Sequence, residues 1–319
     1  MKSALNASHL SNEEAAISYA EARLWPDGPV CPHCGVIGEA SRSKGKTTRP
    51  GLWNCRACRK PFTVRMRTVF ESSHVPMHIW LQAIYLMCSS KKGISTRQLQ
   101  RTFGGSMKTA WFLGHRVREA MTILKIADPL GGEGKTVEID ETYIGGLEKN
   151  KHAHKRQHAG RGGTGKAPVF ALVERDGSVR AFHVPNVNGA NLAAIVNEHV
   201  AKGTTIYSDD NHTTRYSAHG YSRDAVRHQD GEYVRGLVHT NTVEGFFSIL
   251  KRGVTGVYHS VSEAHLNRYL AEFGFRHSNR SALGIEDALR TDLALQGVKG
   301  KRLTYETTRS AGRAEKAAD

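Results

Sequence analysis

The sequence predicts an α/β domain that follows a small cysteine-containing module and a helical region. Three observations support this prediction. They are two C-x2-C pairs near the N-terminus, apolar residues at helical spacing after them, and a later change to short runs rich in β-branched and aromatic residues. The 319 residues are enough for two or three modules with cores of their own.

The chain is strongly basic. Lys and Arg number 45 against 30 Asp and Glu, which gives a formal net charge of +15. Such an excess favours a polyanionic partner, most often nucleic acid, over a merely soluble basic surface. No apolar run approaches the roughly 18–20 residues needed to span a bilayer, and the N-terminus is unlike a signal peptide. We therefore expect a soluble intracellular protein without a membrane partner.

A cysteine module is predicted over residues 27–70, after an N-terminal helix within residues 1–26. “CPHC” and “CRAC” form two C-x2-C pairs with twenty residues between them. A redox dithiol would need only one pair, whereas two pairs at this spacing are typical of a zinc ribbon. Four thiolates at about 2.3 Å leave no open position on the ion, so we expect one structural Zn²⁺. Its predicted ligands are Cys31, Cys34, Cys55 and Cys58.

Residues 71–127 have the apolar period of helices. Within them, “STRQLQRTFG” and “SMKTAWFLGHRVREAMTIL” are separated by Gly104 and Gly105. Two helices joined by a tight Gly-containing turn predict a helix-turn-helix, although a helical hairpin used only for packing has the same pattern. Cations on the second helix favour DNA contact. The predicted contacts are Lys108, Arg116 and Arg118.

The α/β domain is predicted over residues 128–290. “TVEIDETYIGG”, “APVFALVER”, “SVRAFHVPNV” and “TTIYSDD” have the composition of strands, and “GANLAAIVNEHV” has helical spacing. Between the first two strands, residues 147–166 form a basic, Gly-rich insertion that we expect to contact a phosphate backbone. We expect residues 291–319 to be a disordered tail. The predicted DNA contacts of the insertion are Lys149, Lys151, Lys155 and Arg156.

Acidic residues end two of the predicted strands. Asp140 ends “TVEID”, and Asp209 and Asp210 end “TTIYSDD”. Open α/β sheets usually place their chemistry at the carboxyl ends of strands, and carboxylates among many cations suit Mg²⁺ shared with phosphate. Acids at strand ends also cap turns and helices, and that alternative remains open.

A third acid, Glu244, lies 35 positions beyond Asp209, at the start of an amphipathic helix. Asn241 precedes it by three residues, the spacing of a capping box, which would stabilise the helix without any chemistry. Lys251 follows Glu244 by seven residues and so lies on the same helical face, within reach of a phosphate bound near the acid.

These motifs resemble a known family. The cysteine pairs, “ISTRQLQRTFGGSMKTAWFLGHRVREAM”, “VEIDETYIGG”, “HTNTVEGFFSILKRG” and “GVYHSVSEAHLNRYLAEFGFR” are together similar to bacterial insertion-sequence transposases of the ISXO type, over about residues 20–280. Asp140, Asp209 and Glu244 look like the acidic triad of RNase H-like DDE transposases. The sequence departs from the family in doubling the second acid as Asp209-Asp210.

The resemblance implies an RNase H-like catalytic domain in which the triad is catalytic and holds two Mg²⁺ or Mn²⁺ ions. It also implies nicking of double-stranded DNA at element ends and joining of the freed 3′-OH to target DNA, with no small-molecule substrate. Such a protein would act as a homodimer or larger assembly on DNA and be cytoplasmic and associated with the bacterial nucleoid. Expected contacts near the scissile phosphate are His239, Asn241, Lys251 and Arg252, with His228, Arg268 and Arg276 as further candidates.

Two other functions fit parts of the pattern. One is a domesticated regulator, in which a zinc ribbon and a helix-turn-helix bind DNA beside an inert α/β scaffold. The other is an RNase H-like nuclease that acts on branched or hybrid substrates. A decayed element would be expected to have lost a triad acid, whereas all three are present here.

Overall fold

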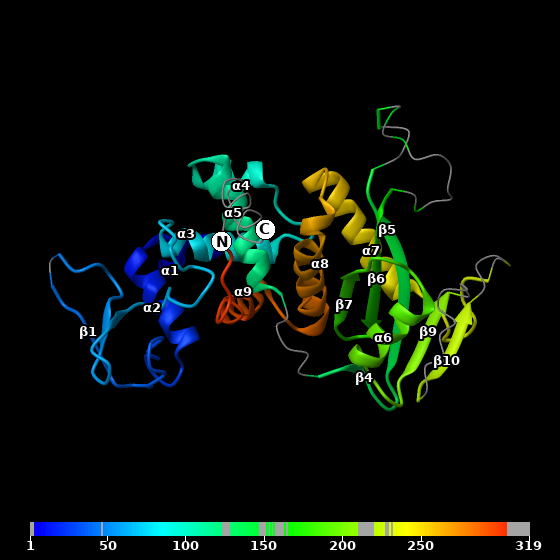
Figure 1. Cartoon of the computed structure of the whole chain (residues 1–319), viewed down its shortest axis with the longest axis horizontal. Coiled ribbons are helices and arrows are strands. Elements are labelled where there is room, and N and C mark those ends of the chain that lie inside the picture. The colour runs from blue at the N-terminus through cyan, green and yellow to red at the C-terminus, as the bar shows by residue number, and fades with distance from the viewer. Residues whose placement is uncertain are drawn as a thin grey trace, which may run out of the picture. The chain divides into compact units, whose positions relative to one another are not determined.

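The computed structural model describes residues 3–45, 47–122, 128–146, 151–152, 154, 156, 163, 165–209, 220–226, 230 and 232–304. The chain forms two compact units (Figure 1). Unit 1 comprises Met1–Met87, Thr96–Ala120 and Thr291–Asp319, and unit 2 comprises Cys88–Ser95 and Met121–Arg290. In the described part of the chain, no helix is both long and apolar enough to cross a membrane.

Unit 1 begins with short helices. After η1 (Ala4–Asn6) and α1 (Ser8–Ser11), the predicted N-terminal helix is present as α2 (Glu13–Leu24). Asn12 caps α2, because its side-chain oxygen accepts a hydrogen bond of 3.0 Å from the backbone N–H of Ala15. The apolar face of α2 is buried, as its helical spacing predicts.

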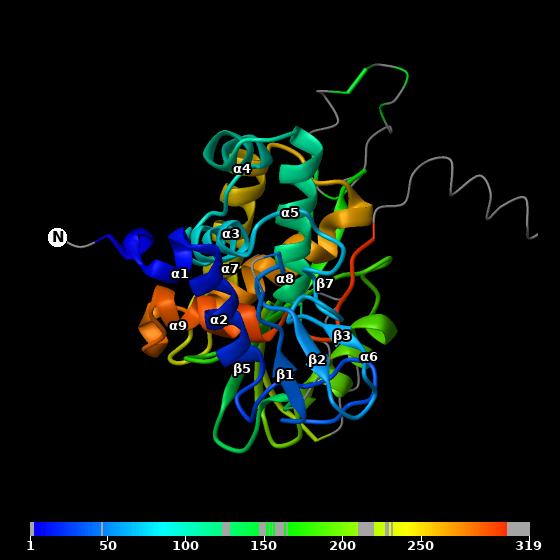
Figure 2. The same ribbon diagram turned by 90° about the vertical axis from the view of Figure 1, so that its left-hand side faces the viewer.

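The cysteine module follows α2 and contains a small antiparallel sheet of three described strands (Figure 2). They are β1 (Ala40–Arg42), β2 (Trp53–Cys55) and β3 (Pro61–Phe62). Its core is Phe62 packed with Cys31 and Cys55, flanked by Trp25 and Trp53. So small a core cannot hold a module together by apolar burial alone, which is why the cysteines matter to its stability.

Most of the predicted helical region is also in unit 1. It contains α3 (Met77–Ser89), α4 (Thr96–Phe103) and α5 (Met107–Ala120). Gly104 and Gly105 both have φ of +77°, a left-handed conformation that glycine adopts without strain, and they make the turn between α4 and α5. Ser106 caps α5 by accepting a hydrogen bond from the Thr109 N–H at 3.1 Å.

The C-terminal prediction is wrong for the residues that the structure describes. Helix α9 (Asp287–Gln296) continues the chain past residue 291, and Val298 after it is fully buried. The side chain of Asp292 forms an ion pair with Arg23 at 3.2 Å, and Lys301 donates a hydrogen bond to the Ala120 carbonyl. The segment 291–304 is therefore an ordered part of unit 1. Residues 305–319 lie outside the described residues.

Unit 2 is an α/β domain with a sheet of five described strands in the order β10-β9-β5-β6-β7. β6 is antiparallel to both β5 and β7, whereas β9 is parallel to β5 and β10 is parallel to β9. Counted along the chain, this is the order 3-2-1-4-5 with the second strand reversed, which is the RNase H-like topology. The elements are β5 (Thr136–Ile144), β6 (Ala167–Glu174), β7 (Val179–His183), α6 (Gly189–His199), β9 (Thr205–Asp209), β10 (Ser222–Val226), α7 (Asn241–Gly253) and α8 (Glu263–Ser278).

Shorter elements complete unit 2. β4 (Leu130–Gly131) pairs in parallel with β8 (Val200–Ala201). A single π-helical turn, η6 (Val254–Tyr258), continues α7, and η7 (Ser281–Leu283) follows α8. β4, β8 and β10 were not predicted from the sequence.

Two cores lie on opposite faces of the sheet. Val137 and Ile139 of β5 pack with Ile206 and with residues of α6. The other face packs against the apolar residues of α7 and α8 (Figure 1). Because side chains alternate along a strand, Glu138 and Asp140 project from the face that α7 covers.

Candidate active site and metal centre

Two of the predicted acids are neighbours across the centre of the sheet. In the parallel pairing of β5 with β9, Ile139 lies opposite Ser208, and the pairing ends there. Asp140 and Asp209 are the next residues of their strands, so they project side by side from the α7 face. The prediction that Asp140 ends its strand is wrong, because β5 continues to Ile144. It is β9 that ends.

The third acid reaches this face from helix α7. Val243, Phe246 and Leu250 bury the apolar side of α7 against β6 and α8. Glu244 lies in the first helical turn and is exposed. The hydroxyl of Thr240, itself buried, donates a hydrogen bond of 2.9 Å to the Glu244 carboxylate.

The charges of the other two acids act on Asp140. The pKa of Asp140 is raised to about 7. Burial is the largest cause, the charge of Glu141 is next, and the charges of Asp209 and Glu244 raise the pKa further, against a lowering hydrogen bond from the Glu141 N–H. Several carboxylates around a partly buried aspartate with a raised pKa are a suitable site for a divalent cation.

The capping-box alternative for Glu244 is not supported. Thr240 is the N-cap of α7 and its side chain does not cap the helix, while Asn241 is the first helical residue and is exposed. The N–H groups of Thr242 and Val243 instead bind the carboxylate of Glu138 on β5, at 2.7 and 3.0 Å. Sequence reasoning missed Glu138, although the signal was present as an acid two residues before Asp140 on the same face of β5.

The other candidate contacts around α7 differ in exposure. Lys251 and Arg252 are exposed in its last turn, and the Arg252 Nε donates a hydrogen bond of 3.1 Å to the Ser248 carbonyl. His239 is half-buried before the helix, with Nδ1 2.9 Å from an Arg175 nitrogen and 3.3 Å from Glu138. Lys251, Arg252 and Asn241 can therefore reach a ligand, whereas His239 is held in an internal network.

Two predicted DNA contacts in the helix-turn-helix need correction. Arg116 is 6% exposed and Arg118 is 1% exposed. The guanidinium of Arg116 donates hydrogen bonds of 2.8 Å to the carbonyls of Val69 and Glu71, so it joins segments of unit 1. Neither side chain is available to DNA. Lys108, in the first turn of α5, is exposed and remains a candidate.

The basic insertion is described only in part. Arg156 is exposed and its Nε donates a hydrogen bond of 2.9 Å to the Lys151 carbonyl. Lys149, Lys155, His228 and the second acid of the doublet, Asp210, lie outside the described residues.

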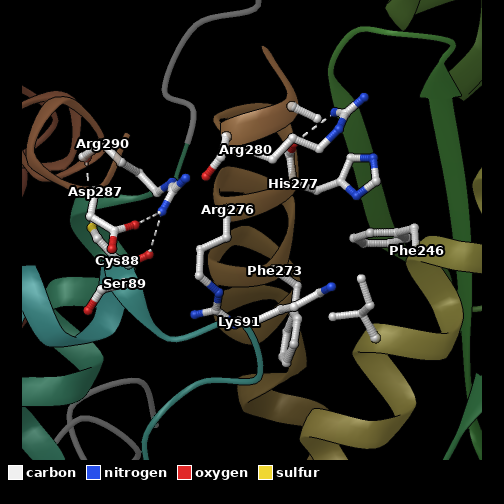
Figure 3. A pocket seen from close by; sticks show the side chains of 13 residues that line it. Cys88, Ser89, Lys91, Phe246, Phe273, Arg276, His277, Arg280, Asp287 and Arg290 are labelled. Carbon is white, nitrogen blue, oxygen red and sulfur yellow. Dashed lines mark hydrogen bonds and ion pairs between the residues drawn. The ribbon is translucent and has the colours of Figure 1, made fainter. Parts of the chain in front are cut away.

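Unit 2 contains a cavity of about 540 Å³. Figure 3 shows its lining side chains, which include several cations. These cations serve the fold. Arg276 is 7% exposed and ion-paired with Glu272, Arg280 donates to the Gly177 carbonyl at 2.8 Å, and Arg290 donates to the Cys88 carbonyl at 3.1 Å. Arg276 is thus an internal residue, and the suggestion that it contacts phosphate is not supported.

The zinc-ribbon cysteines gather as predicted. The ligand atoms of Cys31, Cys34, Cys55 and Cys58 all lie within 4.8 Å of one another. The sulfurs of Cys31 and Cys58, and those of Cys34 and Cys55, are 3.6 Å apart. This is too far for a disulfide, but close to the edge of about 3.8 Å that a tetrahedron with 2.3 Å zinc–sulfur bonds requires.

The thiol chemistry of this cluster also suits a metal. Burial raises the pKa of the Cys31 thiol, but hydrogen bonds from the backbone N–H groups of Cys34 and His33 outweigh it, and the pKa falls to about 6. A thiolate is the form that binds zinc. Four sulfur donors fit a closed structural Zn²⁺ site.

Comparisons with known proteins agree with this description. The family model of the transposase zinc-ribbon domain matches residues 11–61, and that of the ISXO2-like transposase domain matches residues 129–278. A relative from Halobacterium salinarum (strain ATCC 700922 / JCM 11081 / NRC-1), named as an uncharacterized protein in transposable element ISH50, is 30% identical over 296 residues. The match covers 89% of this chain and 96% of the relative.

A solved structure, the Mos1 strand transfer complex, is similar at 12% identity, with 64% of this chain and 77% of that chain covered. The TM-score is 0.22, which is too low to establish a shared fold.

Proposed function

The chain belongs to the family of ISXO2-like transposases, and we propose that this DNA transposase cuts and joins DNA at Asp140, Asp209 and Glu244. One observation carries the assignment of these residues. Burial and the charge of Glu141 raise the pKa of Asp140 on β5, and the charges of Asp209 on β9 and Glu244 on α7 raise it further. Carboxylates held against their mutual repulsion are the arrangement that a cation site requires.

We propose that the triad holds two Mg²⁺ ions, with Mn²⁺ as a substitute. The donor set is entirely carboxylate, which suits these hard ions. Unlike the four cysteines, the three acids do not form a cluster with all ligand atoms within 4.8 Å of one another. Two ions about 3.5–4 Å apart accept wider spacing of their ligands than a single ion. When bound, such ions would activate the attacking oxygen and stabilise the leaving oxygen.

The acids would have different positions relative to the ions. Asp140 would serve both ions, and Asp209 and Glu244 would each hold one of them. In the first step a water oxygen bonds to phosphorus, the bond to the 3′-oxygen breaks, and that oxygen leaves as a 3′-OH after taking a proton. In the second step this 3′-OH attacks a target phosphodiester and displaces its 3′-oxygen. Neither step needs a covalent bond to the protein.

Exposed cations would hold the DNA. Lys251 and Arg252 lie about two turns of α7 beyond Glu244, roughly 10 Å along the helix, where they can bind phosphates near the scissile bond. In unit 1, the zinc ribbon and the start of α5 with Lys108 would bind the element end. Bringing two ends together requires at least a dimer on DNA.

The experiment uses the purified protein and a duplex that carries the inverted repeat flanking the gene. With Mg²⁺ the wild type should nick the end and transfer the strand. Asp140→Asn, Asp209→Asn and Glu244→Gln should each lose cleavage by about 10³-fold or more and still bind the end. Asp210→Asn is the matched comparison for the doublet, and we expect it only to weaken cleavage.

The outcomes separate the possible functions. Retained cleavage in the triad variants would overturn the assignment of the catalytic residues. End binding by the wild type without any cleavage would identify a regulator. Cleavage of branched or hybrid duplexes in preference to element ends would identify a nuclease.

A further inference from the structure

Glu138 is an internal carboxylate that joins the two elements carrying Asp140 and Glu244. It is 0% exposed. One carboxylate oxygen accepts hydrogen bonds from the N–H groups of Thr242, at 2.7 Å, and Val243, at 3.0 Å. The other accepts from the Thr242 hydroxyl at 2.8 Å and from the Arg175 Nε at 2.7 Å. A buried charge is costly unless it is satisfied in this way, so the arrangement is specific.

Arg175 extends the same network to the residues before α7. It follows β6 in a turn, and its guanidinium donates to the carbonyls of Leu237, at 2.9 Å, and His239, at 3.1 Å. It also lies 2.9 Å from the Nδ1 of His239. Glu138 and Arg175 together therefore fix both the approach to α7 and its first turn relative to the sheet.

The first turn of α7 is capped by a carboxylate far along the chain, as is that of α3, whose Met77 and His78 N–H groups bind Glu13. Helices α2 and α6 are capped by the residue just before them, Asn12 and Asn188, each through its side-chain oxygen. At α7 the residue in that position, Thr240, donates its hydroxyl to Glu244 instead. The distant carboxylate of Glu138 takes over the capping, which leaves Thr240 to orient the acid.

The contact between Glu138 and Thr242 lies next to two of the proposed catalytic acids, because each partner is two residues from one of them. Glu138 and Asp140 are two residues apart on β5, roughly 7 Å along one face. Thr242 and Glu244 lie in one turn of α7. We propose that Glu138 is a positioning residue that sets the separation of Asp140 and Glu244, and that it binds no metal itself because its oxygens are already occupied by four donors. This inference rests on the proposed function of the triad.

The test compares Glu138→Gln with Glu174→Gln. Glu138→Gln keeps the side-chain shape. Its neutral amide, however, replaces one acceptor oxygen by an NH2 group, which cannot accept from the N–H donors. Glu174 is the matched control because it too is a strand carboxylate that ties down a second segment, by accepting from the Gly131 N–H and from Lys135, both at 2.9 Å. Arg175→Lys is a second test variant. It keeps the charge near Glu138 and removes the fork that reaches Leu237 and His239.

The main readout does not depend on activity. Fe²⁺ with ascorbate and peroxide cuts the polypeptide near bound metal, so wild-type protein should be cut near residues 140 and 244. In Glu138→Gln and Arg175→Lys, cutting near 244 should fall relative to cutting near 140, and the Mg²⁺ midpoint for DNA cleavage should rise about 10-fold. Excess Mn²⁺ should restore part of the activity. Glu174→Gln should lose melting temperature without either change.

Several results would overturn the inference. One is a folded Glu138→Gln whose ratio of cutting near 244 to cutting near 140, and whose Mg²⁺ midpoint, are both those of the wild type. Another is a Glu174→Gln whose cutting ratio and Mg²⁺ midpoint change as much as those of Glu138→Gln. If Glu138→Gln does not fold, the same two readouts in Arg175→Lys decide. Asp140→Asn and Glu244→Gln are run alongside. If those two variants retain activity, the triad assignment itself is wrong. If they are inactive while Glu138→Gln behaves like the wild type, only the positioning role of Glu138 is wrong.

Discussion

Burial, followed by the charges of neighbouring acids, raises the pKa of Asp140 in the metal-free protein. Its folded pKa of about 7 is higher than the usual value for aspartate of about 4. The folded state therefore binds this proton more tightly than the unfolded state does. The resulting stabilisation is complete below pH 4 and is lost as pH rises through 7.

We therefore expect the metal-free wild type to lose roughly 3–4 kcal/mol of unfolding free energy between pH 4 and pH 8 that Asp140→Asn does not lose. Denaturant melts of both proteins in EDTA at several pH values, restricted to the transition of unit 2, would measure this. Adding Mg²⁺ at pH 8 should stabilise the wild type more than the variant.

Glu198→Gln is the control for this measurement, because Glu198 is an exposed acid on α6, on the opposite face of the sheet. It should follow the wild type at every pH. If the unfolding free energies of wild type and Asp140→Asn change in parallel with pH, the raised pKa of Asp140 does not affect stability.

At this scale the roles of the three acids remain predictions, and residue burial was predicted poorly. Asp140, Asp209 and Glu244 drew attention because each lies near an expected strand or helix end in the sequence. The sequence could not show that Arg116 is buried, because its hydrogen-bond acceptors are backbone carbonyls 45 and 47 positions away. Glu138 was missed for the same reason, because its partners on α7 lie 104 and 105 positions along the chain.

Among the elements, the zinc ribbon is the one whose four cysteines fit a structural ion. Purified protein should contain about one Zn²⁺ per chain. Cys31→Ser should lose that zinc, leave the segment 31–62 sensitive to protease and reduce binding to element ends. Metal analysis, limited proteolysis and a mobility-shift assay would measure these effects.

The fifth cysteine provides the control for zinc binding. Cys88 is buried in α3 and lies outside the four-cysteine cluster. Cys88→Ser should therefore retain the full zinc content. If zinc-free Cys31→Ser still resisted protease over residues 31–62, the module would not be a zinc ribbon.

Helices with strong apolar periodicity were predicted from the sequence, whereas a strand at the edge of the sheet was not. Helices α2, α3, α4 and α5 follow their apolar spacing. Strand β10 was missed because it lies at the edge of the sheet and “SRDAV” exposes its first three residues, so it lacks an apolar pattern. The role of the basic insertion 147–166 in DNA binding remains a prediction.

At the scale of the whole molecule, unit 1 is discontinuous in sequence, because segments from both sides of unit 2 complete it. Deleting residues 291–319 removes buried Val298, the Asp292–Arg23 ion pair and the hydrogen bond from Lys301 to Ala120. We expect unit 1 to melt roughly 10 °C lower or more, with loss of end binding. Thermal melts monitored by tryptophan fluorescence would follow unit 1.

Deletion of residues 305–319 alone is the matched comparison, because it keeps all of these contacts. It should leave the melting of unit 1 close to that of the full chain. Equal melting of unit 1 in both deletions would mean that the segment 291–304 contributes nothing to its stability.

The division of unit 1 along the chain also orders events during synthesis. Residues 291–304 leave the ribosome after the whole of unit 2 has been made. The nascent chain can therefore assemble the sheet that bears the three acids while unit 1 still lacks Val298 and Asp292. A stop codon just beyond residue 290 would yield a polypeptide with every triad acid and every zinc ligand, yet without the segment that closes unit 1.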